Sequence, residues 1–186
     1  YALQAARAMF SLKTYVEIIG WWAKIRNDVQ GEAIRKCIQG YVAGALFQTG
    51  NEEKALEYYT SIGDIGSIVF CLKKRKDYKG DKTMLEYLSY HFPDNPYVHS
   101  LLQEYITSLE VYSDYFQENG TTEACYQMCM KASSKSKSPA AWLYSAAFLK
   151  NQMGQTYVAS NILIRAEKCE TSVFLQESMK VLRIMI

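Results

Sequence analysis

Two cysteines four residues apart are the side chains whose spacing best suits metal binding. Cys125 and Cys129 would lie on one face of a helix, and two thiolates in that arrangement can ligate zinc. The two histidines, His91 and His99, would have to approach from another part of the chain to complete the site. Because both cysteines also fall at positions where small residues recur, we expect them to pack in a core, and we predict no metal and no other cofactor.

The acidic and histidine side chains favour structural roles over catalysis. Glu110 and Asp114 stand at i, i+4 and could work as paired carboxylates, but a solvated helix face explains the same spacing. His91 and His99 flank the proline-containing break at 93–96, where they would decorate a junction between repeats. The sequence contains no G-x-S-x-G, no Walker-type glycine loop and no H-E-x-x-H. We therefore predict that the protein is not an enzyme.

Two tryptophans could serve binding instead. Trp21 and Trp22 are adjacent, so their side chains point about 100° apart on a helix. We expect one of them in the core and the other exposed, where it could stack on a carbohydrate.

The composition indicates that helices must position these side chains. The 186 residues include only 10 Gly and 3 Pro, too few turn-forming residues for a many-stranded β protein. Apolar residues make up 49% and charged residues 22%, as expected for a folded domain with one sizeable core. A net charge of +2 argues against a nucleic-acid-binding domain, so no nucleic acid is expected as a partner. These observations predict an all-α fold.

The spacing of the cysteines bears on where the protein is located, and the residues at the two ends bear on whether it is a fragment. Five cysteines at scattered spacings do not suggest a disulfide framework. Free thiols favour a cytoplasmic location, with a bacterial periplasm or envelope as the alternative, and the localisation stays unassigned. No apolar run approaches the roughly 18 residues of a membrane span. Both ends lie inside apolar helical patterns, which leads us to expect a fragment of a longer, bacterial repeat protein.

Apolar spacing at i, i+3, i+4 and i+7 predicts short amphipathic helices that come in pairs. Residues 133–138, Ser-Ser-Lys-Ser-Lys-Ser, are predicted as a low-complexity linker. Candidate N-caps precede several helices: Asn51, Asp64, Asp81, Asn95 and Thr121. The predicted helices span about 1–11, 14–27, 31–48, 52–62, 65–76, 82–91, 96–118, 121–132, 139–152 and 155–169, with an eleventh from Ser172.

A frame of 34 residues relates the later pairs. Gly120 and Gly154 are 34 residues apart. Gly50 lies 70 before Gly120 and shares their frame, because the residues around it keep the same spacing: Ala43, Ala55, Tyr59 and Ile62. Small residues at a crossing let two antiparallel helices approach closely. In each pair, a small residue on the first helix lies 12 before one on the second: Ala43 and Ala55, Ser113 and Cys125, Ala147 and Ala159.

These residues resemble the tetratricopeptide repeat family. The resemblance is strongest over residues 47–59, FQTGNEEKALEYY, and over 139–166 with Trp142 and Gly154. The first pair departs from the pattern, because Lys13 stands where the turn glycine belongs. The resemblance implies a right-handed α-solenoid of antiparallel helix hairpins, about five hairpins plus one further helix. In a single domain 1–186, the approximate repeats are 1–30, 31–63, 64–95, 96–138 and 139–171, with 172–186 as the extra helix.

In that family, one face of each first helix lines a concave groove that holds a peptide or partner segment. The predicted groove would be acidic on one side and aromatic and amide on the other, which suits a basic or polar extended segment. The basic members of the family's carboxylate clamp are missing, so capture of a C-terminal carboxylate is not expected. The 34-residue alignment places eight side chains in this groove: Glu110, Asp114, Gln117, Glu118, Tyr144, Phe148, Asn151 and Gln152.

We therefore expect a non-enzymatic interaction scaffold that binds a protein or peptide partner of unknown identity on its concave face, in an unknown oligomeric state. One alternative, a ligand- or glycan-sensing helical domain of a bacterial envelope protein, requires Trp21 or Trp22 exposed beside a cavity. An RNA-binding helical repeat array requires a repeated basic residue, which the sequence lacks. A helical-toroid glycoside hydrolase requires an acidic pair in a deep pocket.

Overall fold

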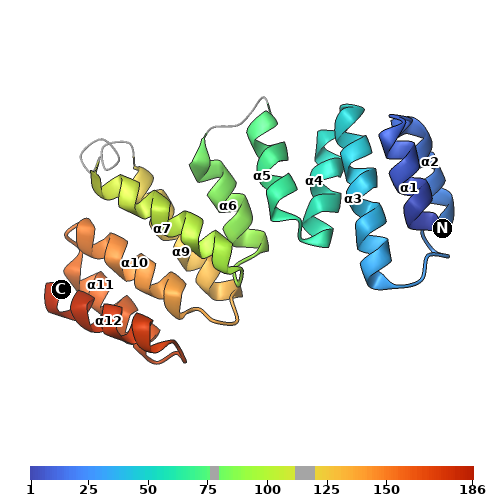
Figure 1. Cartoon of the computed structure of the whole chain (residues 1–186). Helices are drawn as coiled ribbons and strands as arrows, with labels where there is room; N and C mark the ends of the chain where they lie inside the picture. Colours follow the sequence, from blue (N-terminus) through green and yellow to red (C-terminus); the bar gives the residue numbers. More distant parts are fainter. Residues whose placement is uncertain (76–79, 112–119) are drawn as a thin grey trace. The chain divides into compact units, whose positions relative to one another are not determined.

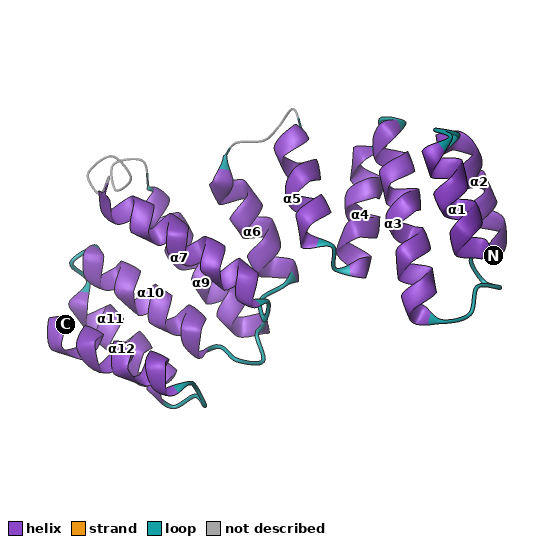
Figure 2. Ribbon diagram, in the orientation of Figure 1, coloured by secondary structure: helices purple, strands orange, loops and turns teal. Residues whose placement is uncertain are grey.

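The described part of the chain is helical apart from its turns. The computed structural model describes residues 1–75, 80–111 and 120–186, and within these ranges it contains eleven α-helices and no strand (Figure 1, Figure 2). The all-α prediction is confirmed for these residues. The helices are α1 (Ala2–Ser11), α2 (Tyr15–Ile25), α3 (Glu32–Gln48), α4 (Glu52–Ile62), α5 (Ile65–Lys74), α6 (Asp81–His91), α7 (Pro96–Val111), α9 (Thr121–Lys135), α10 (Ala140–Gln152), α11 (Thr156–Glu167) and α12 (Val173–Met185).

The contacts divide the chain into two compact units, Tyr1–Gly80 and Asp81–Ile186. Within each unit, adjacent helices run antiparallel, and most consecutive pairs pack against one another (Figure 1). In the first unit α3 packs against α4 and also against α1 and α2, and in the second α10 packs against α9, α11 and α12. The boundary between the units falls inside the predicted repeat 64–95, whose helices α5 and α6 belong to different units. The single domain and the repeat bounds stay predictions.

Small residues lie where consecutive helices cross. The α3–α4 and α10–α11 pairs make the most extensive helix contacts of the described chain. The alanines predicted for these two crossings are fully buried, as a close approach of two helix backbones requires. Ser113, predicted for a third crossing, lies outside the described residues. The crossing residues with 0% exposure are Ala43, Ala55, Cys125, Ala147 and Ala159.

Left-handed glycines close the turns between helices. Gly50 follows α3 with a φ of +79°, and its N–H and that of the next residue donate to the carbonyls of Phe47 and Leu46 at 3.1 and 2.9 Å. These paired hydrogen bonds form a Schellman motif, which favours glycine because no Cβ is present. Gly154 after α10 and Gly120 before α9 have φ values of +70° and +65°. The three predicted turn glycines are confirmed.

Lys13 adopts the same left-handed conformation without being a glycine. Its φ of +59° is the one positive φ of a non-glycine residue in the described chain. The N–H groups of Lys13 and Thr14 donate to the carbonyls of Phe10 and Met9 at 3.0 Å each, the same pairing as at Gly50. The departure seen in the sequence is therefore a strained copy of the glycine turn.

Replacing Lys13 with glycine should stabilise the protein. A side chain in the left-handed region costs about 1–2 kcal/mol, and the larger backbone entropy of unfolded glycine offsets part of the gain. We expect Lys13→Gly to raise the free energy of unfolding by about 0.5–1 kcal/mol in urea titrations. Lys13→Ala, which removes the charge and keeps the Cβ, should leave stability unchanged. An equal gain in both variants would contradict a backbone origin.

Side-chain caps confirm some predicted helix starts and correct others. Asp64 and Asn95 each accept a hydrogen bond from a backbone N–H in the first turn of the following helix, at 3.0 and 2.9 Å. Asn51 precedes α4 but its side chain forms no capping hydrogen bond. The prediction of Asp81 and Thr121 as caps is wrong, because each is already the first residue of its helix.

The predicted linker 133–138 is shorter than expected, because α9 continues to Lys135. Two serine hydroxyls in its last turn donate to carbonyls three residues earlier, which lets serine occupy helical positions. The Lys135 ammonium lies 3.0 Å from the centroid of the Tyr90 ring, and the Asp94 carboxylate accepts a hydrogen bond from the Ser136 hydroxyl at 2.6 Å. Tertiary contacts therefore order a segment whose composition suggested a linker.

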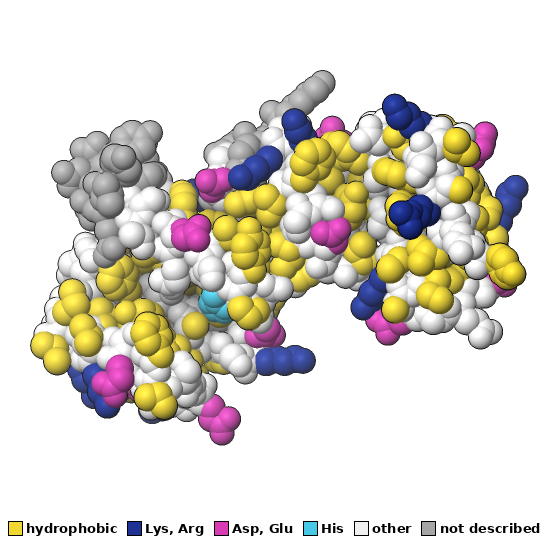
Figure 3. Space-filling view, viewed as in Figure 1, with side chains coloured by type: hydrophobic (Ala, Val, Ile, Leu, Met, Phe, Trp, Pro, Cys, Tyr) yellow, Lys and Arg dark blue, Asp and Glu magenta, His cyan; other side chains and the backbone are white. Residues whose placement is uncertain are grey.

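Lys, Arg, Asp and Glu side chains are scattered over the face drawn in Figure 3, with hydrophobic side chains between them. Among the described helices, none combines the length and the apolarity that crossing a membrane requires.

Candidate functional site

The predicted groove is described in part. Tyr144, Phe148 and Asn151 are half-buried along one face of α10, and Gln152 is exposed at its end. These side chains share a face of α10, and both the aromatic side and the acidic side of the groove stay predictions. The acidic side lies outside the described residues: the side chain of Glu110 in α7, and Asp114, Gln117 and Glu118.

A hollow of about 700 Å³ lies on the first unit, between α1, α3 and the corner that joins α4 to α5. We call it the α1–α3 hollow. Its lining includes the rings of Phe10, Tyr41 and Tyr59, and the centroids of Phe10 and Tyr41 are 5.5 Å apart. Gly40 and Gly44 of α3 also line the hollow, and at Gly40 the helix backbone is left bare. The hollow therefore combines apolar surface with an approachable helix backbone.

Gly40 and Gly44 stand one helical turn apart, but they have different roles. A Cβ on Gly44 would lie 2.8 Å from Cε2 of Phe10, so Phe10 can rest against α3 only because Gly44 has no side chain. A Cβ on Gly40 would lie 3.8 Å from Cδ1 of Ile62, an ordinary contact, so Gly40 leaves space for a side chain from elsewhere. Glycine inside a helix costs about 1 kcal/mol relative to alanine. Two glycines at this spacing were the sequence signal that could have located the hollow.

Polar side chains complete the lining of the α1–α3 hollow. Arg7 and Lys36 are exposed, and Lys36 pairs with Glu32 at 2.7 Å, which lowers the pKa of that carboxyl. Asp64 is engaged in capping α5. Burial raises the pKa of the Tyr59 hydroxyl, which therefore stays protonated and can donate or accept a hydrogen bond. The hollow offers cationic and neutral polar groups beside its rings.

The five cysteines are free thiols. Cys125 and Cys129 are fully buried, so the prediction that they pack in the core is confirmed. Burial raises the pKa of Cys71 to about 11 and that of Cys125 to about 12, and it also raises the pKa of Cys129. Cys37 is exposed and lines the α1–α3 hollow. The described residues contain no group of three His, Cys, Asp or Glu side chains that could hold a metal ion.

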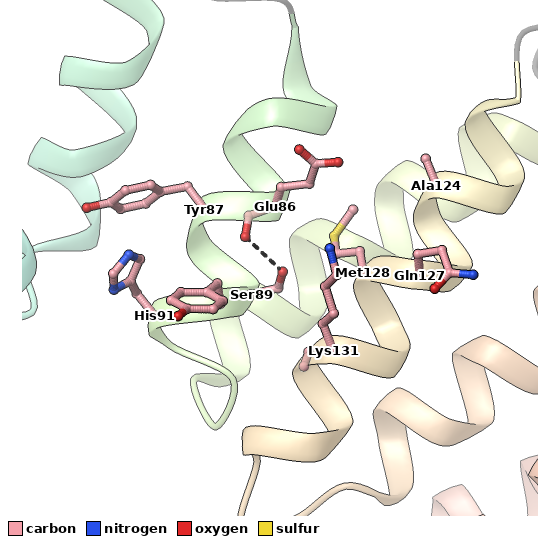
Figure 4. Close-up of a pocket in the computed structure, with 10 residues that line it drawn as sticks. Glu86, Tyr87, Ser89, His91, Ala124, Gln127, Met128 and Lys131 are labelled. Atoms are coloured by element: carbon pink, nitrogen blue, oxygen red, sulfur yellow. Dashed lines mark hydrogen bonds between the residues drawn. The ribbon is translucent and has the colours of Figure 1, made fainter.

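A second hollow, of about 470 Å³, lies on the second unit between α6 and α9 (Figure 4). In Figure 4, Met128 and Lys131 rise from α9 toward α6, and Glu86 extends from α6. The Ser89 hydroxyl at the base donates to the Glu86 carbonyl at 3.3 Å. Apolar and aromatic side chains dominate this lining, with Glu86 and Lys131 as charged members.

Aromatic contacts organise one side of this second hollow. The His91 ring lies 4.4 Å from Tyr87 and 5.0 Å from Tyr90, between ring centroids. Hydrogen bonding to Lys135 lowers the pKa of Tyr90, while burial and then the Lys135 charge lower the pKa of His91. His91 is therefore mainly neutral at pH 7, and it packs as an aromatic side chain.

One tryptophan lies in the core as predicted, but the other is half-buried and not exposed as expected. Trp22 is 3% exposed and belongs to the core of the first unit, whereas Trp21 is half-buried and packs against that core. Trp22 lines a polar hollow of about 440 Å³ together with Arg26 and Arg35. Stacking on a sugar needs an open ring face, and Trp22 does not have one. The condition set for a glycan site is therefore not met at Trp22.

The corner between α6 and α7 is held by a shared carbonyl. The Pro93 carbonyl accepts a hydrogen bond from the indole N–H of Trp142 at 2.7 Å and lies 3.2 Å from Nε2 of His99. Because a carbonyl only accepts, Nε2 of His99 carries the proton. Its Nδ1 is buried and has no hydrogen-bond partner among the described residues, and the His99 and Trp142 ring centroids are 4.2 Å apart. The corner thus holds His99 in the neutral form.

Acidification should lower the free energy of unfolding, because His99 is buried in its neutral form. Burial lowers the pKa of His99 below its ordinary value of 6.5, although the Pro93 carbonyl and the Asp94 charge act in the opposite direction. The unfolded chain therefore binds more protons as the pH falls below about 6.5, so stability is full above that pH and is lost below it. We expect the drop in urea midpoint between pH 7.5 and 5.5 to shrink in His99→Phe. The same drop in wild type and His99→Phe would contradict this.

No family model, curated protein or solved structure matches this chain. The fold itself defines the class: within the described residues, this is an all-helical protein of eleven helices, with antiparallel contacts between adjacent helices inside each unit.

Proposed function

We propose that the chain is a right-handed α-solenoid of tetratricopeptide-like hairpins, and that it acts as a non-enzymatic scaffold for an extended segment of a partner protein. Two kinds of observation support the architecture. Helices α3 and α10 each contact their hairpin partner and also a helix of a neighbouring pair, as stacked repeats require. The left-handed residues Lys13, Gly50 and Gly154 close equivalent turns with equivalent hydrogen bonds.

The α1–α3 hollow carries the functional proposal. Helices α1 and α3 are the first helices of their hairpins, the position that lines the binding groove in the resembled family. The hollow combines rings, bare backbone at Gly40 and polar groups such as Gln4 and Ser67, which can bond to a peptide backbone. Its exposed cations, Arg7 and Lys36, favour a segment that carries an acidic residue. We propose an extended segment with one apolar side chain over Gly40 and an acidic residue facing Arg7.

The test uses short random peptides displayed on phage and selected against the purified chain. Enriched peptides, made synthetically, should bind with micromolar affinity in fluorescence polarisation. Gly40→Leu should fill the hollow and weaken binding by about tenfold or more, and added salt should weaken it through Arg7. Gly20→Leu is the matched control, because it makes the same change inside α2, where a Cβ would meet nothing within 4 Å.

The alternatives give different results in the same experiment. Peptides that ignore Gly40→Leu but are lost in Glu110→Lys with Asp114→Lys would move the site to the predicted groove and reject the α1–α3 hollow. A selection that enriches no peptide would reject the scaffold function.

A further inference from the structure

Helix α12 is apolar on two sides. Met179 and Leu182 are buried, whereas five large apolar side chains of the same helix are 58–86% exposed. Their spacing puts Val173, Phe174, Val181 and Ile184 within about a third of a turn of one another, on the side away from Leu182. We call them the α12 stripe: Val173, Phe174, Val181, Ile184 and Met185.

The α12 stripe is symmetric in sequence. Phe174 and Ile184 stand five residues before and after Met179, and Val173 and Met185 stand six before and after it. Two copies of α12 packed antiparallel about an axis at the level of Met179 would therefore place Phe174 against Ile184 at both ends. A two-fold contact needs such a self-complementary surface.

The charges of α12 fit the same arrangement. The Glu177 carboxylate and the Lys180 ammonium are 2.7 Å apart within one copy, and both side chains are well exposed. In an antiparallel pair Glu177 faces Val181 of the other copy, so it also lies beside that copy's Lys180. Opposite charges then meet across the contact, which gives the pair its register.

We propose that the α12 stripe is the interface of a homodimer in which two α12 helices pack antiparallel about a two-fold axis near Met179. Each exposed side chain of this size offers roughly 100 Å², so the stripe buries about 500 Å² per copy and about 1,000 Å² in total. That area is at the low end for specific interfaces, so the dimer is weak, with a micromolar to submillimolar dissociation constant. The interface uses no residue of the α1–α3 hollow.

Sedimentation velocity of the whole chain, from low micromolar to submillimolar concentration, tests the dimer. The wild type should shift from monomer to dimer as concentration rises, and Phe174→Glu and Ile184→Glu should each stay monomeric. Tyr157→Glu is the matched control, because Tyr157 is an 80% exposed residue on α11 outside the stripe, and this variant should still dimerise. Circular dichroism melting checks that each variant is folded.

A charge exchange tests the antiparallel register. Glu177→Lys brings four ammonium groups together and should weaken the dimer by about tenfold. The double variant Glu177→Lys with Lys180→Glu restores opposite charges across the two-fold and should recover the wild-type affinity. A wild type that stays monomeric, a dimer that survives Phe174→Glu, or assemblies that grow beyond a dimer would each overturn the proposal.

Discussion

Replacing Trp142 with alanine should lower the free energy of unfolding by about 3–5 kcal/mol, the largest loss we expect from a single truncation. Trp142 on α10 has 0% exposure, and its indole is the larger of the two hydrogen-bonded rings that hold the Pro93 corner. Truncation would leave a cavity in the second unit and remove one donor to the Pro93 carbonyl. Urea unfolding followed by circular dichroism measures the loss.

Two controls separate packing from hydrogen bonding at this corner. Trp142→Phe keeps most of the ring and loses the N–H, so we expect a smaller cost of about 1–3 kcal/mol. Trp21→Ala removes a half-buried indole from α2 and should also cost less than Trp142→Ala. A loss below about 1 kcal/mol for Trp142→Ala would mean that the indole does not anchor the corner.

Overpacking the α10–α11 crossing should give the second large effect. Ala159 on α11 has 0% exposure, as does Ala147 on α10, in the most extensive helix contact of the described chain. A leucine at 159 would force the two backbones apart, so Ala159→Leu should cost about 1–3 kcal/mol. The expected readout is a lower melting temperature.

The control for this crossing lies on the same helix. Asn161 is exposed, so Asn161→Leu adds a similar side chain where nothing opposes it and should change stability by less than about 0.5 kcal/mol. An unchanged melting temperature in Ala159→Leu would contradict a close crossing at this point.

Several features could be predicted from the sequence because their causes are local. A left-handed turn residue favours glycine whatever surrounds it, so Gly50, Gly120 and Gly154 could be placed from spacing alone. The same frame pointed to Lys13, and the structure shows that this lysine accepts the strained conformation. The capping hydrogen bond to Asp64 likewise forms within the first turn of α5, the helix that this residue precedes.

Other features depended on contacts between distant segments. The end of α9 was placed too early, because Lys135 is held by Tyr90, 45 positions earlier in the chain. The α1–α3 hollow was missed, because Gly44 acquires its role only when Phe10 from another helix rests on it. The contact between Lys135 and Tyr90 leaves no signal in the spacing of residues along one helix. The spacing of Gly40 and Gly44 marks a place on α3 without side chains, but it does not show which helix packs there.

By itself, the sequence determined that the chain is helical, where its helices turn and which small residues mark their crossings, because these follow from backbone conformation and from periodicity within one helix. Only the tertiary structure decided that Trp22 and not Trp21 completes the core, that His99 and Trp142 share one carbonyl, and that α12 keeps an exposed apolar stripe. Each of these depends on which faces of separate helices meet. The periodicity of apolar residues shows which face of a helix is apolar, but it does not determine which other helix packs against that face.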